Sequence, residues 1–159
     1  MTDSRNPAAQ TSSRASALVT GASGGIGEEL ARALAADGHD LILVARGTAA
    51  LERLAADLRA RHGTGVRVEA ADLSAPGAAR ALAGRLLDDG VVVDVLVNNA
   101  GFGVAGPVAE NDPDRLSAMV ALNIGALTDL TRAFLPGMLA GGGAASSMSA
   151  LRLHSSRGR

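Results

Sequence analysis

The residues best suited to chemistry form a glycine-rich turn, Thr20-Gly21-Ala22-Ser23-Gly24-Gly25-Ile26-Gly27, between an apolar run and an amphipathic run. Gly21 allows a sharp turn, Gly25 allows close approach of a pyrophosphate, and Gly27 allows tight packing of helix against strand. The N-terminus of the following helix offers N–H groups and a partial positive charge. We therefore expect the turn to bind a phosphate-bearing dinucleotide, the alternative being a plain glycine turn.

A basic residue ends the second expected strand, where the choice between two dinucleotides is made. Sheets that bind NAD place an acid there, which bonds the ribose 2′-hydroxyl. Here the strand ends Val44-Ala45-Arg46, and a guanidinium can instead pair with a 2′-phosphate through two charge-assisted hydrogen bonds. The pattern predicts NADP in preference to NAD, the alternative being that Arg46 only begins a solvated helix.

The elements that would position these groups alternate between short apolar runs and amphipathic helical runs. This alternation predicts an α/β fold with a doubly wound parallel sheet of the Rossmann type. Asp112 suits a helix cap, Pro113 suits a first helical position, and Ser74 is the expected cap of the third helix. The expected strands are Ala17–Thr20, Asp40–Ala45, Val66–Ala71 and Val91–Val97. The expected helices are Gly25–Asp37, Thr48–Arg61, Ser74–Asp89 and a stretch from Asp112 to about Leu139.

From Gly141 the sequence shows no strand or helix period. We therefore expect the sheet to be truncated after the fourth strand and the helices that follow it. In that case Val91–Val97 would form an unpaired apolar edge, which favours aggregation or pairing with another chain.

Further motifs follow the turn in order. Asp72-Leu73 comes after the third expected strand, Asn98-Asn99-Ala100-Gly101 ends the fourth, and Asn123 lies in Leu122-Asn123-Ile124-Gly125. Together with the TGxxxGxG spacing of the turn, these motifs resemble the short-chain dehydrogenase/reductase (SDR) family. The resemblance covers roughly residues 17 to 140, and by analogy with the family the strand order is 3-2-1-4.

The resemblance implies an NADP-dependent oxidoreductase that transfers hydride between nicotinamide and a carbonyl or alcohol. It implies that Asp72 contacts adenine and that Asn123 is a catalytic residue that holds a proton-relay water. The expected cofactor-binding residues are Gly21, Ser23, Gly25, Ile26, Gly27, Arg46, Asp72, Leu73, Asn99, Ala100 and Gly101.

The rest of the family's catalytic set does not occur in this sequence. The family uses a serine, a tyrosine as general acid/base and a lysine that lowers the tyrosine pKa, the last two spaced YxxxK. The 159 residues contain no Tyr, and all 15 basic residues are Arg. Ser146, Ser147 and Ser149 lie near the expected serine, and we assign them no catalytic role. We expect the chain to be inactive alone; the alternative function is a non-catalytic dinucleotide-binding or interaction fragment.

The C-terminal residues fit a shifted reading frame. Codons allowed for Ala144–Ala150, read one base out of frame, can spell GRIINVSS, which resembles the family's fifth strand with its serine. The single codon of Met148 supplies the G that the shifted Val codon needs. We expect a family member that is C-terminally truncated and frameshifted after about Ala140, the alternative being a naturally diverged C-terminus.

Composition excludes several classes of function. A net charge of −1 gives no support for nucleic acid as partner. The absence of cysteine excludes disulfides and thiolate metal sites, and the three histidines, His39, His62 and His154, are too scattered for zinc. No metal is expected. No apolar run reaches the ~20 residues that span a bilayer, and the N-terminus lacks the apolar core of a secretory signal.

These properties predict a cytoplasmic protein with three regions. Residues 1–16 are the expected disordered lead, 17–140 the dinucleotide-binding domain and 141–159 an irregular tail. The expected partner is a small-molecule carbonyl or alcohol, with no nucleic acid and no membrane. The family resemblance adds that members are often homo-oligomers.

Overall fold

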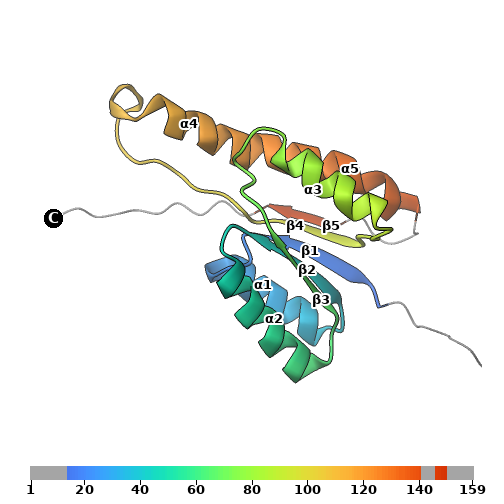
Figure 1. Ribbon diagram of the computed structural model, residues 1–159. Coiled ribbons are helices and arrows are strands. Elements are labelled where there is room, and N and C mark those ends of the chain that lie inside the picture. Colours follow the sequence, from blue (N-terminus) through green and yellow to red (C-terminus); the bar gives the residue numbers. More distant parts are fainter. Residues whose placement is uncertain (1–13, 141–145, 150–159) are drawn as a thin grey trace, which may run out of the picture.

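A single parallel sheet organises the protein. The computed structural model describes residues 14–140 and 146–149, and within them five strands pair in the order β3-β2-β1-β4-β5 (Figure 1). All four strand pairs are parallel. The α/β Rossmann-type fold and the predicted order 3-2-1-4 of the first four strands are therefore confirmed. The strands are β1 (Ser16–Thr20), β2 (Asp40–Ala45), β3 (Val66–Ala70), β4 (Val95–Asn98) and β5 (Ser146–Ser149).

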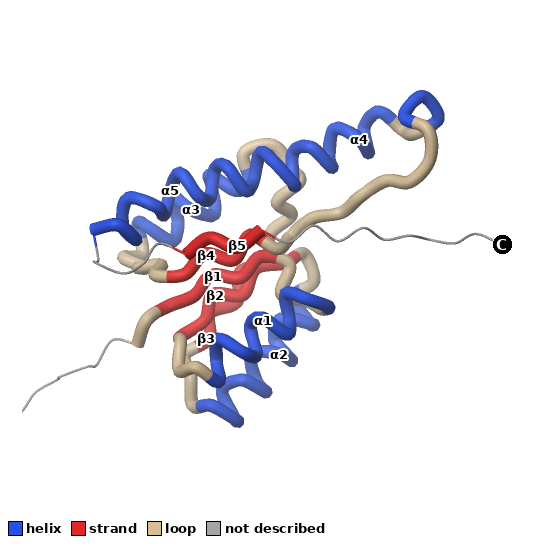
Figure 2. The backbone as a smooth tube through the Cα atoms, turned by 180° about the vertical axis from the view of Figure 1, so that it is seen from behind, coloured by secondary structure: helices blue, strands red, loops and turns tan. Residues whose placement is uncertain are grey.

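Helices cover both faces of this sheet. Seen from behind, α1 and α2 lie against one face and α3 and α5 lie against the other, while α4 extends beyond the strands in line with α5 (Figure 2). The helices are α1 (Gly25–Ala36), α2 (Thr48–His62), α3 (Ala78–Asp88), α4 (Pro113–Val120) and α5 (Leu127–Ala140), with a short 3₁₀ turn, η1 (Val108–Glu110), and a π-helical turn, η2 (Ala121–Ala126). The predicted disordered lead lies outside the described residues except for 14–16, of which Ser16 begins β1.

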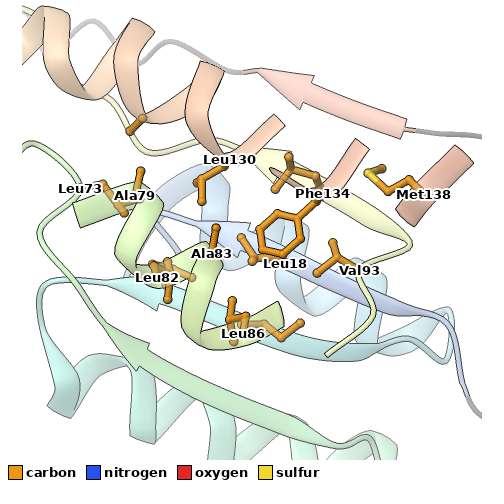
Figure 3. Packing of buried hydrophobic residues seen from close by; sticks show 14 residues of the cluster. Leu18, Leu73, Ala79, Leu82, Ala83, Leu86, Val93, Leu130, Phe134 and Met138 are labelled. Atoms are coloured by element: carbon orange, nitrogen blue, oxygen red, sulfur yellow. The ribbon is translucent and has the colours of Figure 1, made fainter. Parts of the chain in front are cut away.

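The sheet divides the hydrophobic core into two layers because side chains of a strand alternate between its faces. On β2, Leu41 and Leu43 pack with the buried residues of α1 and α2, whereas Ile42 and Val44 pack with those of α3 and α5. Figure 3 shows the second layer, in which Phe134 lies close to Leu18 on β1. Because both faces are covered, β2 is apolar and buried from Leu41 to Ala45, as predicted for a parallel strand.

The third helix begins later than predicted, at Ala78 and not at Ser74. Ser74 does not cap it, because the Ser74 backbone N–H and hydroxyl both bond the Asp72 carboxylate, at 3.0 and 2.6 Å. Gly77, at φ 74°, stands in the left-handed region just before the first helical residue. The segment from Asp72 to Gly77 is therefore a turn that belongs to the end of β3.

The fourth strand is shorter than predicted, and the sheet does not end with it. The strand begins at Val95, because Val91–Asp94 first cross from α3 to the sheet, with the Asp94 N–H bonded to Ser16 O at 2.9 Å. Ser146–Ser149 then pairs with β4 as a fifth strand, so the predicted truncation after the fourth strand and the predicted irregular tail are wrong for these four residues. Backbone pairing explains the difference, since an open parallel edge binds a strand through N–H and C=O groups whatever its side chains.

The helical stretch after β4 begins as predicted. The Asp112 carboxylate accepts the Asp114 N–H at 3.0 Å, and Pro113 occupies the first turn. The run Pro113–Ala140 is long and apolar enough, by length and composition alone, to cross a membrane, so the prediction that no run reaches that length is wrong. On one side of this run, Leu130, Phe134 and Met138 are buried in the hydrophobic core.

Candidate functional site

A cleft of about 730 Å³ opens at the carboxyl ends of the parallel strands, the place where ligands bind in open α/β sheets. Its walls come from the turn after β1, the ends of β2 and β3, the segment after β4, and α4 with η2. The lining residues are Gly21, Ser23, Val44, Ala45, Arg46, Gly47, Ala71, Asp72, Leu73, Ser74, Ala100, Gly101, Phe102, Arg115, Ala118 and Leu122. The cleft lies within the size range of ligand pockets, 300–1,000 Å³ by order of magnitude.

The glycine-rich turn has the geometry predicted from its spacing. Gly21 and Gly25 have φ values of 69° and 60°, in the left-handed region that favours glycine. Gly27 is needed for a different reason: a Cβ there would lie 2.4 Å from Gly21 O and 2.4 Å from Asn99 Nδ2. The tight packing predicted for Gly27 is thus confirmed, and the turn leaves no room for a side chain at this position.

Thr20 joins the turn after β1 to the motif after β4. Its side chain is 2% exposed, and Oγ1 accepts the N–H groups of Asn99 and Ala100 at 3.0 and 2.9 Å. The hydroxyl donates to Val97 O at 3.2 Å. In return, Asn99 Nδ2 donates to Thr20 O at 3.0 Å. One buried hydroxyl therefore fixes the two segments that form the floor of the cleft.

Replacing Thr20 with valine is expected to lower the free energy of unfolding by about 2–4 kcal/mol. Valine has the same shape but no acceptor, so the half-buried N–H groups of Asn99 and Ala100 lose their partner, at up to about 1–3 kcal/mol each. Thr20→Ser, which keeps the hydroxyl, is the matched control and should lose less than half as much. Urea unfolding of the three proteins measures both changes; equal losses for valine and serine would contradict the assigned role.

The cleft presents donors to an anionic ligand. Among the described residues no side chain caps the N-terminus of α1, so its first-turn N–H groups stay available beside Gly21 and Ser23. Arg46, directly after β2, is exposed, and within the described part of the chain its guanidinium makes no hydrogen bond or ion pair. Helix donors and an unpaired guanidinium in one cleft are suited to phosphate groups.

Among the described residues that line this cleft, Asp72 is the one with a carboxylate. Hydrogen bonds from the Ser74 hydroxyl and backbone N–H, and then the positive charge of Arg46, hold its pKa below the usual value. Asp72 therefore stays ionised, and two arginines, Arg46 and Arg115, line the same cleft. The Arg115 guanidinium also lies over the ring of Phe102, 5.9 Å from its centroid.

Asn123 lies in the π-helical turn η2 and holds the segment after β4. Its Oδ1 accepts the Phe102 N–H at 3.1 Å, and its Nδ2 donates to Phe102 O at 2.9 Å. Such wide turns are frequent at functional positions. The Asn123 side chain therefore fixes the position of the segment after β4. That it also holds a relay water stays a prediction.

The fold brings most of the predicted cofactor-binding residues to one cleft. Seven of them line it directly: Gly21, Ser23, Arg46, Asp72, Leu73, Ala100 and Gly101. The remaining four, Gly25, Ile26, Gly27 and Asn99, form or brace the turn beside it. Ile26, at 49% exposure, faces outward at the start of α1 and not toward the core.

Sequence reasoning missed four residues of the site. Thr20 belonged to the motif, and a threonine at the buried end of a strand was a usable signal. Ser74 was interpreted as a cap of α3. Phe102 and Arg115 gave no signal, because only the tertiary fold brings α4 over the segment after β4.

Comparison with known proteins gives consistent relatives. The family profile for short chain dehydrogenases matches residues 15–150. Dehydrogenase/reductase SDR family member 7B from Bos taurus is 36% identical over 127 residues, which is 77% of this chain and 39% of that protein. A very-long-chain 3-oxoacyl-CoA reductase from Phaeosphaeria nodorum is 37% identical over 127 residues, 77% of this chain and 37% of that protein. The chain thus spans less than half the length of these relatives.

Solved structures share the fold over the same part of the chain. A short-chain dehydrogenase from Sphingobium yanoikuyae in complex with NADPH superposes with a TM-score of 0.76 and 38% identity, covering 83% of this chain and 51% of that one. L-sorbose reductase from Gluconobacter frateurii, complexed with NADPH and L-sorbose, gives 0.77 and 33%, covering 84% and 51%.

Proposed function

Because the chain belongs to the short-chain dehydrogenase family, we propose that it carries the NADP(H)-binding half of an oxidoreductase acting on a carbonyl or alcohol. The observation that supports NADP over NAD is Arg46 at the end of β2, whose guanidinium makes no hydrogen bond or ion pair with any other residue that the structure describes, at the place where an acid would favour NAD. Both solved relatives named above hold NADPH.

The residues of the cleft fit such a cofactor. The uncapped N-terminus of α1 is suited to the pyrophosphate, and Arg46 to a 2′-phosphate. Asp72 and Leu73 would hold the adenine end, as the family resemblance implies. Ala100 and Gly101 border the cleft on the side of β4. When bound, NADPH would supply the hydride, and the residues of the cleft would bind and orient the cofactor.

Proton transfer is the step for which this sequence lacks the family's tyrosine and lysine. Neither a tyrosine general acid/base nor a lysine beside it occurs in the 159 residues. A dinucleotide-binding fragment without turnover is therefore the second candidate function, and the same observation favours it. We further propose that the residues after about Ala140 are encoded in a shifted frame, since codons for Ala144–Ala150 can spell the family's fifth strand one base out of register.

Two proteins test this proposal together: the chain as given, and the product of the same gene with one base corrected near codons 140–143. We expect NADPH-dependent reduction of a panel of carbonyl compounds only from the corrected protein, with the given chain at least ~10²-fold slower for lack of a general acid. Turnover by the given chain that Arg46→Ala abolishes would contradict its inactivity. Absence of an intact YxxxK frame downstream of the correction would refute the frameshift.

A further inference from the structure

The turn after β3 places an acid close to the arginine that is proposed to bind a 2′-phosphate. Asp72 and Arg46 line the same cleft, and the charge of Arg46 is felt at the Asp72 carboxylate, where it helps lower the pKa after the two Ser74 hydrogen bonds. Even so, the two side chains form no ion pair. Among the described residues, no nitrogen of the Arg46 guanidinium lies within 4.0 Å of an oxygen of the Asp72 carboxylate.

Ser74 holds the Asp72 carboxylate instead. A single oxygen of Asp72, Oδ1, accepts both the Ser74 hydroxyl at 2.6 Å and the Ser74 backbone N–H at 3.0 Å. This pattern is an Asx-type turn, which fixes the side chain of the acid against its own backbone two residues on. The Asp72 carboxylate is therefore held in place by two donors that do not come from Arg46.

We propose that Ser74 is a positioning residue for cofactor specificity: by holding the Asp72 carboxylate within its own turn, it leaves the Arg46 guanidinium available for a 2′-phosphate. A carboxylate released toward Arg46 would compete with the phosphate for the same donors and would repel it. The 2′-hydroxyl of NADH carries no charge and would be nearly indifferent to that competition. The inference rests on the proposed preference for NADP(H), and its effect is on the ratio of two affinities.

Ser74→Ala tests the inference through the dissociation constants of NADPH and NADH, measured by fluorescence titration. We expect NADPH to bind about 5- to 10-fold more weakly, less than the loss of a whole charge-assisted hydrogen bond, because the Ser74 backbone N–H still holds Asp72; NADH should change less than about twofold. Ser74→Thr keeps the hydroxyl and should retain the affinity of the original chain. Adding Asp72→Asn to Ser74→Ala removes the competing charge and should raise the NADPH affinity again relative to NADH.

Two results would overturn the inference. One is an equal loss of NADPH and NADH affinity in Ser74→Ala, which would make Ser74 a support for the adenine end only. The other is an unchanged ratio of affinities in a Ser74→Ala protein whose circular dichroism shows it folded. Either differs from a failure of the proposed function, which would appear in the original chain as equal or tighter binding of NADH.

Discussion

We expect Gly27→Ala to lower the free energy of unfolding by about 2–4 kcal/mol and to weaken dinucleotide binding, although it adds only one methyl group to a helix. The added Cβ would lie 2.4 Å from Gly21 O and 2.8 Å from Gly21 C, and these are backbone atoms that cannot rotate away. Overpacking of this kind costs about 1–3 kcal/mol or more. Here the atom displaced belongs to the phosphate-binding turn, so stability and binding should fall together.

Gly84→Ala is the matched control for this substitution. Gly84 lies inside α3, and a Cβ there meets no atom within 4 Å. Alanine should therefore stabilise this helix by about 0.4–1 kcal/mol and leave the cleft unchanged. Urea unfolding and NADPH titration of both variants measure the contrast, and a Gly27→Ala protein as stable as the original chain would show that the turn is not close-packed.

The second large effect is expected at Arg46. Arg46→Ala removes the only charged donor at the end of β2 among the residues that line the cleft. We expect NADPH to bind about 10- to 100-fold more weakly, as charge-assisted hydrogen bonds contribute about 1.5–3 kcal/mol. NADH binding should change by less than about twofold, because its ribose 2′-hydroxyl is neutral.

Arg53→Ala is the matched control for Arg46→Ala. It shows whether NADPH affinity depends on a direct contact with Arg46 or only on the positive charge of the protein. Arg53 is exposed on α2 and is not part of the cleft lining, so this variant changes the net charge equally. Its NADPH affinity should equal that of the original chain at physiological salt, where distant surface charges are largely screened. Equal weakening by Arg46→Ala and Arg53→Ala would point to a general electrostatic effect and not to recognition of a 2′-phosphate.

The sequence was enough to predict the parallel sheet, because a strand that is buried on both faces consists of consecutive apolar residues. The residues from Leu41 to Ala45 are all apolar and buried, and the predicted strand Asp40–Ala45 has the bounds of β2. The glycine spacing was equally informative, since Gly27 can be only glycine when its Cβ would overlap the backbone of Gly21. In both cases a local pattern and the tertiary structure impose the same requirement.

The predictions were wrong where a residue or segment could form more than one set of hydrogen bonds. Ser74 has the chemistry of a helix cap, but it bonds the Asp72 carboxylate, and nothing in the sequence ranks the two outcomes. Ser146–Ser149 has no strand period, yet it pairs with β4 because backbone groups at an open edge bind any extended segment. Phe102 and Arg115 come together only through the packing of α4 over the cleft.

Titration of the chain with NADPH and with NADH tests the central claim most directly. The claim is that the turn Thr20–Gly27 and the residue Arg46 form a site for a dinucleotide with a 2′-phosphate. It predicts saturable binding of both dinucleotides at one site, with NADPH at least about tenfold tighter, as expected for one charge-assisted contact. Binding of neither, or NADH bound as tightly as NADPH, would contradict it.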